Sequence, residues 1–247
     1  MPRHSQPRPR KQAKPPAAPP RSSLRRAKSP AAQRKPSRST PSTSAFGQNP
    51  ALLLEQYQET LRTLAQSETL NSGNLPQAFQ TITEACCDLL QVERASIWLL
   101  SKDQTSITLI DLFESSSHQH SAEMILQSAQ YPTYFQSLLN VERAIAAHDA
   151  HKDPRTSEFS RTYLAPLNIG AMLDAPIRQK GQVVGVLCTE HIGGPRRWTI
   201  YEEQLTSSLA TMATLAMEAA ERREVEDRKS TRLNSSHSRA SRMPSSA

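Results

Sequence analysis

The alternation of hydrophobic and polar positions divides this chain into helical and extended segments. Apolar residues recur every three or four positions in three segments, which predicts three amphipathic helices: residues 51–70, 75–90 and 199–226. Asn74 precedes the second segment, where an asparagine side chain can cap the first turn of a helix. Thr199 and Glu202 have the spacing of a capping box, so we expect the third helix to begin there.

Extended segments lie between the second and the third predicted helix. They are rich in β-branched, aromatic and leucine residues, which predicts strands at five places: residues 95–100, 106–113, 144–148, 170–178 and 182–191. The connections at 101–104 and 179–181 have the composition of hairpin turns. The less regular middle stretch contains one short segment and two helical segments: residues 122–126, 131–139 and 157–164.

This order of elements predicts the fold class. We expect an α/β (α+β) domain with a central antiparallel sheet and helices on both sides, because helices enclose strands that short turns connect. The helices at the two ends of the domain cover one face of the predicted sheet, and the middle stretch covers the other. A ligand pocket can form between the sheet and the middle stretch.

Composition and charge separate the N-terminal part from this central part. Residues 1–50 contain 12 Lys and Arg, no acid and 11 of the 18 prolines, which predicts a disordered tail. Its basic residues are either an electrostatic tether for nucleic acid or anionic lipid, or part of a solvated tail or a wrongly joined reading frame. Residues 51–226 contain 13 basic and 22 acidic residues, a formal charge of −9 against +7 for the whole chain. The net positive charge of the whole chain is therefore no evidence that the folded part binds nucleic acid.

The last 21 residues resemble a translated sequencing adapter. Residues 227–237 read DRKSTRLNSSH and residues 241–247 read SRMPSSA. These two stretches match the parts of a common short-read adapter that flank its index. We therefore expect residues 227–247 to be a sequencing artefact and the genuine gene to continue beyond Glu226.

Membrane and secretion features are not expected in this chain. It has no run of about 18 apolar residues, and no apolar segment follows its basic N-terminus. Cys86, Cys87 and Cys188 form neither a disulfide framework nor a spaced set of metal ligands. The adjacent cysteines fit small buried hydrophobic residues better than a redox pair. A cytoplasmic location fits these features best.

Several motifs, in order along the chain, resemble the GAF domain family. They are DAHKDPRTSEF from Asp149, YLAPLNIGAMLDAPI from Tyr163, GVLCTEH from Gly185, PRRWT from Pro195 and the pair Glu202-Glu203. The resemblance covers about residues 75–221. Within the family, this segment is most similar to the bacterial GAF modules that precede histidine kinases and diguanylate cyclases. It implies a sheet with helices on both sides, a regulatory ligand in some members and signal output through the terminal helices.

Individual residues distinguish this chain from several subclasses of the family. Bilin-binding GAF domains attach the chromophore to a cysteine in the region of residues 149–164, where this chain has none, so a covalent bilin is not expected. Cyclic-nucleotide GAF domains carry an Asn-Lys…Phe…Asp-Glu pattern, which His151, Lys152 and Phe159 fit poorly. The loop cysteines of GAF-like methionine sulfoxide reductases are missing as well. The cofactor is therefore unknown.

The candidate ligand site combines an apolar wall with a few polar groups, as small-molecule sites do. The residues expected there are Phe159, Tyr163 and Met172 in the wall, with Arg155, Asp174 and Glu190 to orient polar atoms. The alternative is that these residues pack against one another and leave no cavity.

Neither a metal site nor catalysis is expected. Potential metal ligands without motif spacing are His148, His151, Glu190 and His191. Glu190 and His191 have the atoms of an acid/base pair, but no nucleophile or oxyanion site accompanies them. We expect Trp198 to pack the start of the last helix against the sheet and Arg197 to pair with an acid.

These features together predict a non-catalytic sensory or regulatory module, residues 75–226, preceded by an amphipathic linker helix. It is interpreted as the input part of a bacterial signal-transduction protein that binds an unknown small molecule. One alternative is the N-terminal fragment of a histidine kinase or cyclic-dinucleotide enzyme whose catalytic half is missing. Another is a structural dimerisation module without a ligand. The apolar stripes of residues 51–70 and 199–226 predict a parallel homodimer through the terminal helices.

Overall fold

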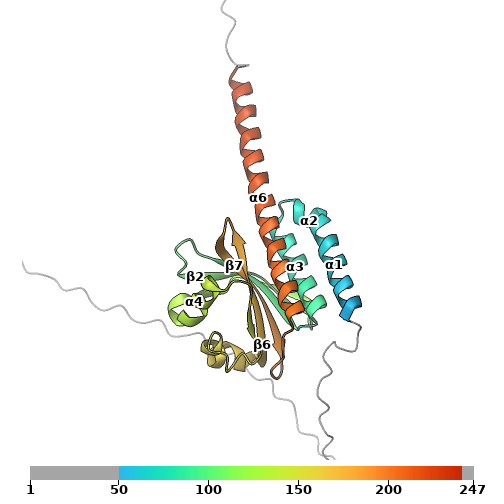
Figure 1. The fold of residues 1–247 in the computed structure, drawn as a ribbon. Coiled ribbons are helices and arrows are strands. Elements are labelled where there is room, and N and C mark those ends of the chain that lie inside the picture. The colour runs from blue at the N-terminus through green and yellow to red at the C-terminus, as the bar shows by residue number, and fades with distance from the viewer. Residues whose placement is uncertain (1–49, 241–247) are drawn as a thin grey trace, which may run out of the picture. The chain divides into compact units, whose positions relative to one another are not determined.

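The computed structural model describes residues 50–240, whose arrangement is shown in Figure 1. The longer helices are α1 (Pro50–Gln66), α3 (Leu75–Leu90), α4 (Pro132–Asn140) and α6 (Ile200–Ala240). The short helical turns are α2 (Glu68–Asn71), η1 (Ser128–Gln130), η2 (Ser157–Phe159), η3 (Ser160–Leu164) and α5 (Ala165–Leu167). The strands are β1 (Arg94–Leu100), β2 (Ser106–Glu114), β3 (Gln119–Ser121), β4 (Ile125–Gln127), β5 (Ile145–Ala147), β6 (Ile169–Gln179) and β7 (Gln182–Ile192). Apart from Pro50, the predicted N-terminal tail lies outside the described residues.

The strands form one antiparallel sheet, which confirms the predicted fold class. Their order is β3-β2-β1-β7-β6-β5, and β4 pairs with β2 beside this path. The hairpins β1–β2 and β6–β7 meet through the pair β1–β7 at the centre of the sheet. This central pair brings residues that are far apart in the sequence side by side, with Arg94 opposite Glu190.

One face of the sheet, here called the helix face, is covered by α3 and α6, and α1 packs against these two helices (Figure 1). The core under these helices includes Phe79, Ile82, Leu205, Leu209 and Ala213. Tyr57 and Leu64 of α1 join the same core. The apolar stripes of the terminal helices are therefore largely buried within one chain, although Leu54 and Leu215 remain 40% and 45% exposed.

The starts of α3 and α6 are confirmed as predicted. The N–H of Gln77 donates to Asn74 Oδ1 over 3.4 Å, which caps α3. The N–H of Thr199 donates to Glu202 Oε2 over 2.7 Å, and the N–H of Glu202 donates to Thr199 Oγ1 over 3.2 Å. This reciprocal capping box satisfies two backbone donors that the first turn of α6 leaves without helical partners.

The opposite face, here called the pocket face, is covered by α4 and by residues 148–167. This covering segment contains η2, η3 and α5 rather than a long helix. A second core lies beneath it and includes Trp98, Tyr134, Leu138, Phe159, Leu164 and Val186. The pocket face is therefore covered by short elements held through side-chain packing.

Two local predictions are wrong. Residues 51–70 do not form one helix, because the N–H of Leu70 donates to Ser67 Oγ over 3.3 Å and so begins α2 separately. Residues 157–164 form a 3₁₀ turn and a π-helical turn instead of a regular helix. Pro166, two residues after Leu164, has no N–H to donate to the carbonyl four residues earlier, which disfavours regular α-helical bonding there.

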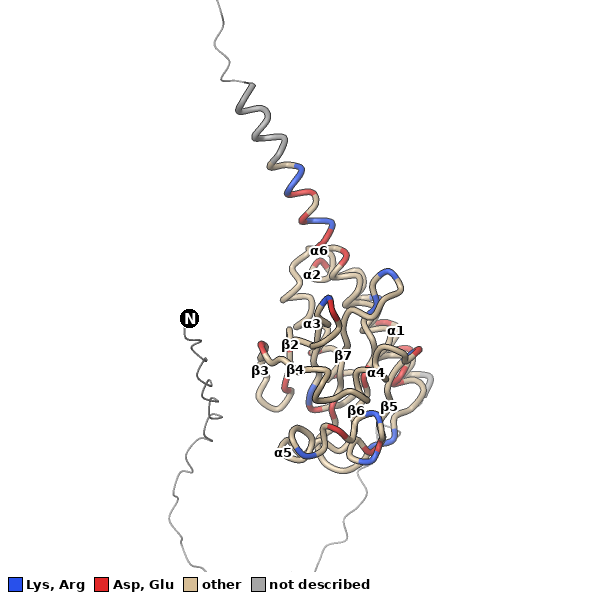
Figure 2. Tube along the Cα trace, turned by 90° about the vertical axis from the view of Figure 1, so that its left-hand side faces the viewer, with Lys and Arg blue, Asp and Glu red and all other residues tan. Residues whose placement is uncertain are grey.

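α6 continues beyond the sheet to Ala240 (Figure 1). Every side chain in residues 221–231 is exposed, and Figure 2 shows acidic and basic residues interspersed along this part of the helix. Arg228 pairs with Glu224 over 3.1 Å, one helical turn away, which supports a solvated helix. Within residues 50–240, no helix is both long and apolar enough to span a membrane.

Candidate functional site

Strand register gathers buried polar residues on the pocket face. Arg94 of β1 lies opposite Glu190 of β7, and Glu190 lies opposite Met172 of β6. Asp174 lies two residues further along β6, opposite Cys188. Since alternate residues of a strand point to the same face, these five side chains share the pocket face. All of them are buried.

Arg94 and Glu190 form a buried ion pair at one side of the site. Arg94 Nε donates to Glu190 Oε2 over 2.8 Å, and the Arg94 guanidinium also pairs with Glu114 at the end of β2. Tyr163 Oη donates to Glu190 Oε1 over 2.7 Å, so both carboxylate oxygens of Glu190 have a partner. Burial raises the pKa of Glu190, and the charge of Arg94 opposes this shift. Burial also raises the pKa of Tyr163, which keeps its hydroxyl a hydrogen-bond donor.

Asp174 makes no ion pair with any residue of the described chain, 50–240. Its Oδ2 accepts a hydrogen bond from Tyr134 Oη over 2.8 Å, but its buried Oδ1 has no protein partner. Burial raises the pKa of Asp174 to about 7, although the hydrogen bond from Tyr134 favours the ionised form. Asp174 is therefore an acid that changes charge near neutral pH and has one unsatisfied oxygen.

Aromatic rings from α4 and the covering segment pack together beside these groups. Tyr131 and Phe159 stack with their ring centroids 4.3 Å apart, and Tyr134 meets the Phe159 ring edge-on at 4.8 Å. Tyr163 is 6.3 Å from Phe159, centroid to centroid, and lies in the π-helical turn η3. π-Helical turns occur often at functional sites. Here the turn carries the residue that joins the covering segment to Glu190.

The packed side chains leave a small cavity of about 20 Å³ on the pocket face. Its lining includes Trp98, Tyr134, Phe159, Tyr163, Met172 and Glu190. A cavity needs about 10–15 Å³ to hold one water molecule, so this one has room for about one water. In this conformation the site is therefore nearly filled by side chains.

The structure brings together four of the six predicted site residues: Phe159, Tyr163, Met172 and Glu190 line the cavity. Asp174 lies behind Tyr134, which lines the cavity and bonds its carboxylate. Arg155 does not line the cavity, because its guanidinium pairs with Asp153 over 2.6 Å and donates to the Ala146 carbonyl of β5 over 3.1 Å.

Sequence reasoning missed Arg94, Trp98 and Tyr134. The first two lie on β1 at positions separated by an even number of residues, so strand alternation places them on one face. A charged residue at the start of a strand with mostly apolar residues was the signal that could have identified Arg94. Tyr134 gave no such signal, because its bond to Asp174 depends on how α4 packs on the sheet.

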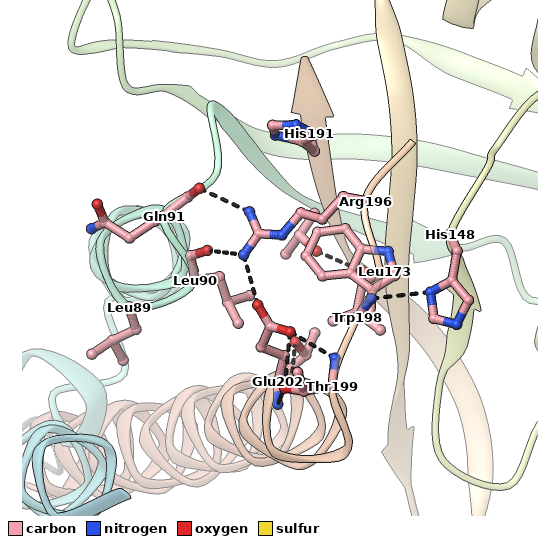
Figure 3. A network of polar contacts seen from close by, with 12 residues as sticks. Leu89, Leu90, Gln91, His148, Leu173, His191, Arg196, Trp198, Thr199 and Glu202 are labelled. Carbon is pink, nitrogen blue, oxygen red and sulfur yellow. Dashed lines mark hydrogen bonds and ion pairs between the residues drawn. The ribbon is translucent and has the colours of Figure 1, made fainter. Parts of the chain in front are cut away.

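Figure 3 shows how the covering segment is joined to the start of α6. His148 follows β5 and begins the covering segment. Its carbonyl accepts a hydrogen bond from the Arg196 N–H over 2.9 Å, and its Nδ1 accepts one from the Trp198 N–H over 3.0 Å. Nδ1 can accept this bond only when it carries no proton. One residue of the pocket cover thus holds two backbone donors just before α6.

Arg196 extends this junction to α3 (Figure 3). Its Nη2 donates to the Leu90 carbonyl and to Glu202 Oε1, both over 2.6 Å. Its guanidinium also lies 4.5 Å from the centre of the Trp198 ring, and Trp198 is buried as predicted. The ion pair expected from Arg197 is made by Arg196 instead, since the Arg197 side chain is exposed.

Residues 50–240 contain no group of three or more side chains arranged to hold a metal ion. The candidate histidines have other partners. His151 Nδ1 lies 2.6 Å from Ser160 Oγ, and His191 Nδ1 lies 3.1 Å from Glu93 Oε2. Burial raises the pKa of the thiols of Cys86, Cys87 and Cys188, which disfavours the reactive thiolate.

Comparisons with known proteins agree with this architecture. The profile of the GAF domain family matches residues 74–217. Comparison of the sequence with curated proteins finds no match. The family match covers more than half of the chain and includes both the pocket face and the junction with α6.

Three solved structures share the fold at low sequence identity. The GAF domain of an Acinetobacter phosphoenolpyruvate-protein phosphotransferase has a TM-score of 0.51 and 16% identity, over 69% of this chain and 95% of its own. The free methionine-R-sulfoxide reductase of Neisseria meningitidis has a TM-score of 0.55 and 11% identity, over 68% and 92%. The bacteriophytochrome RpBphP3 of R. palustris has a TM-score of 0.59 and 15% identity, over 78% and 42%. These structures show the fold, and the family profile over residues 74–217 shows that this chain belongs to the GAF domain family.

Proposed function

We propose that residues 75–226 form a non-catalytic sensory module that passes the state of the pocket face to α6. The module is proposed to be the input part of a cytoplasmic bacterial signal-transduction protein. Its GAF fold supports a regulatory role, since the fold positions a pocket against one face of the sheet and α6 against the other.

The position of His148 is the observation that carries this proposal. A movement of the covering segment that displaces His148 removes hydrogen bonds from Arg196 and Trp198. Arg196 in turn holds Glu202, which caps the first turn of α6. Movements at a ligand site reach other parts of a protein when packed elements switch between discrete arrangements. The His148 junction is such an arrangement between the pocket cover and α6.

An enzyme is compatible with this proposal if it follows α6 in a longer protein. A histidine kinase or a cyclic-dinucleotide enzyme would then receive the output of the module.

A structural module is the second candidate function. The small size of the cavity favours it, because the pocket would then be filled by its own side chains.

A parallel homodimer through the terminal helices is part of the same proposal. Leu54 on α1 and Leu215 on α6 are exposed apolar residues that the folded chain leaves free for a second copy. Light scattering on the full chain tests this, and a monomer at high micromolar concentration contradicts it.

Hydrogen–deuterium exchange on the full chain tests the transmission from pocket to helix. Tyr163→Phe removes the hydroxyl that bonds Glu190 and keeps the ring. We expect amides in residues 196–206 to exchange about tenfold faster, because a hydrogen bond to a charged group contributes about 1.5 kcal/mol and local opening limits exchange. Tyr201→Phe is the matched control, because it removes a hydroxyl from an exposed tyrosine on α6 itself.

Exchange in residues 196–206 should be unchanged in this control. If Tyr163→Phe accelerates exchange only within residues 149–167, the pocket cover does not communicate with α6. That result would favour the structural module.

A further inference from the structure

We propose that the cavity on the pocket face binds a small organic ammonium ion. This inference rests on the proposed sensory function, because it names the ligand class of the same site. It follows from the aromatic lining of the cavity, from an unsatisfied acid beside it and from the charge balance of the face.

The lining of the cavity is suited to a cation. Trp98, Tyr134, Phe159 and Tyr163 contribute four aromatic side chains to one small space. The face of an aromatic ring attracts cations, and aromatic cages of this kind bind ammonium groups. Met172 adds apolar surface that favours the carbon skeleton of an organic ammonium ion over a hydrated metal ion.

Asp174 provides the acceptor that an ammonium group requires. Its Oδ1 is buried and has no hydrogen-bond partner in the described part of the chain, whereas its Oδ2 is bonded by Tyr134. Tyr134 lines the cavity, and so does Cys188, which lies opposite Asp174 in the sheet. An ammonium N–H that reaches Oδ1 gives this atom the donor it lacks, and hydrogen bonds to charged groups are among the stronger ones.

The charge balance of the face disfavours an anion. Arg94 is shared by Glu190 and Glu114, so this cluster carries one excess negative charge before Asp174 is counted. Arg155 is paired with Asp153. Among the described residues, no Lys, Arg or His lines the cavity, so an anion would have to draw on Arg94 and break its buried pair with Glu190.

The size of the cavity restricts the ligand to a small one. A cavity of about 20 Å³ holds about one water, so a ligand must displace part of the wall. Leu126 is the lining residue with the weakest support, since it is only half-buried and lies on the three-residue strand β4 beside the main path of the sheet. We infer that Leu126 moves outward when the ligand enters.

Thermal unfolding of the full chain with three matched probes tests the ligand class. The probes are isobutylamine, isobutanol and isobutyrate, which share a branched skeleton and differ in charge, at equal ionic strength and about pH 8. We expect isobutylamine at about ten times its Kd to raise the melting temperature by about 3–6 °C. Isobutanol should give a much smaller shift, and isobutyrate none.

The variant Asp174→Asn keeps an acceptor for Tyr134 but removes the charge. It should weaken isobutylamine binding by about tenfold or more, and a separate urea titration of the variant checks that it is folded. A larger shift with isobutyrate than with isobutylamine overturns the ammonium class and leaves the sensory proposal standing. No shift with any probe, or equal binding to Asp174→Asn, also overturns it. The sensory proposal itself is tested separately by the exchange of α6 in Tyr163→Phe.

Discussion

On the helix face of the sheet, α1, α3 and α6 bury a continuous apolar core, whereas the pocket face buries Arg94, Asp174 and Glu190 among its aromatic side chains. The helix face has a buried acid as well, but Asp111 accepts from Thr83 Oγ1 over 2.6 Å and lies 3.0 Å from His120 Nδ1. Within residues 50–240, one oxygen of Asp174 on the pocket face has no hydrogen-bond partner.

This difference separates two tasks within one sheet. The helix face gains its stability from apolar burial, which does not depend on pH or on a ligand. The pocket face buries Asp174, whose hydrogen bonds are incomplete within the described residues, and such a group is costly unless something satisfies it. The first face is therefore suited to hold the fold, and the second to respond to its surroundings. Substitutions on the two faces should differ in how the change in stability depends on pH, as well as in the size of that change.

The largest effect is expected from Phe79→Ala on the helix face. Phe79 is fully buried in the core beneath α3, and truncation of a buried phenylalanine costs about 3–5 kcal/mol. The loss should be the same at about pH 5 and about pH 8, because no titrating group is removed. Urea unfolding at both values measures it. A loss that changes with pH would contradict the proposed division between the two faces.

Asp174→Asn on the pocket face should act in the opposite direction. The pKa of Asp174 is about 7 in the folded chain and 3.8 as its ordinary value, so the folded state binds the proton more tightly. Stability is therefore lost as pH rises from about 4 to about 7, by about 4 kcal/mol at most. Asn avoids this cost but accepts a weaker bond from Tyr134, so we expect a net gain of about 3 kcal/mol at about pH 8.

The same variant should gain less than about 1 kcal/mol at about pH 5, where the folded carboxyl is already protonated. Urea unfolding of Asp174→Asn at the two pH values distinguishes these outcomes. An equal gain at both values would show that Asp174 does not titrate between them.

The smallest effect is expected at the start of α6. Thr199→Ala removes the hydroxyl that accepts from the Glu202 N–H, and loss of a helix cap costs about 1 kcal/mol. Asn74→Ala at the start of α3 is the matched control on the helix face. Both should cost similar stability in urea, but only Thr199→Ala should accelerate amide exchange in residues 196–206. Equal acceleration in both variants would argue against a specific junction at α6.

The order of helices and strands could be predicted because most elements have a clear apolar period. The capping box of Thr199 and Glu202 could be predicted for a similar reason, since its two residues are only three positions apart in the sequence. The gathering of Phe159, Tyr163, Met172 and Glu190 was expected from their place in the motifs, and they do line one cavity. The local hydrophobic pattern and the order of the motifs therefore predicted much of the fold and part of the candidate site.

What could not be predicted depends on contacts between distant elements. The pairing of Arg94 with Glu190 is set by the register of β1 against β7. The bond of Tyr134 to Asp174 depends on how α4 docks on the sheet. Arg155 does not line the cavity for a local reason, since Asp153, two residues away, bonds its side chain at the sheet edge.

The most direct test of the central claim is a double-mutant cycle between the pocket and the junction. Hydrogen exchange in residues 196–206 is measured for the wild type, Tyr163→Phe, His148→Ala and the double variant, all as the full chain. If His148 carries the coupling, each single variant accelerates exchange, and the double variant exchanges no faster than His148→Ala alone. If the two accelerations simply multiply in the double variant, the pocket and α6 respond independently and the account is contradicted.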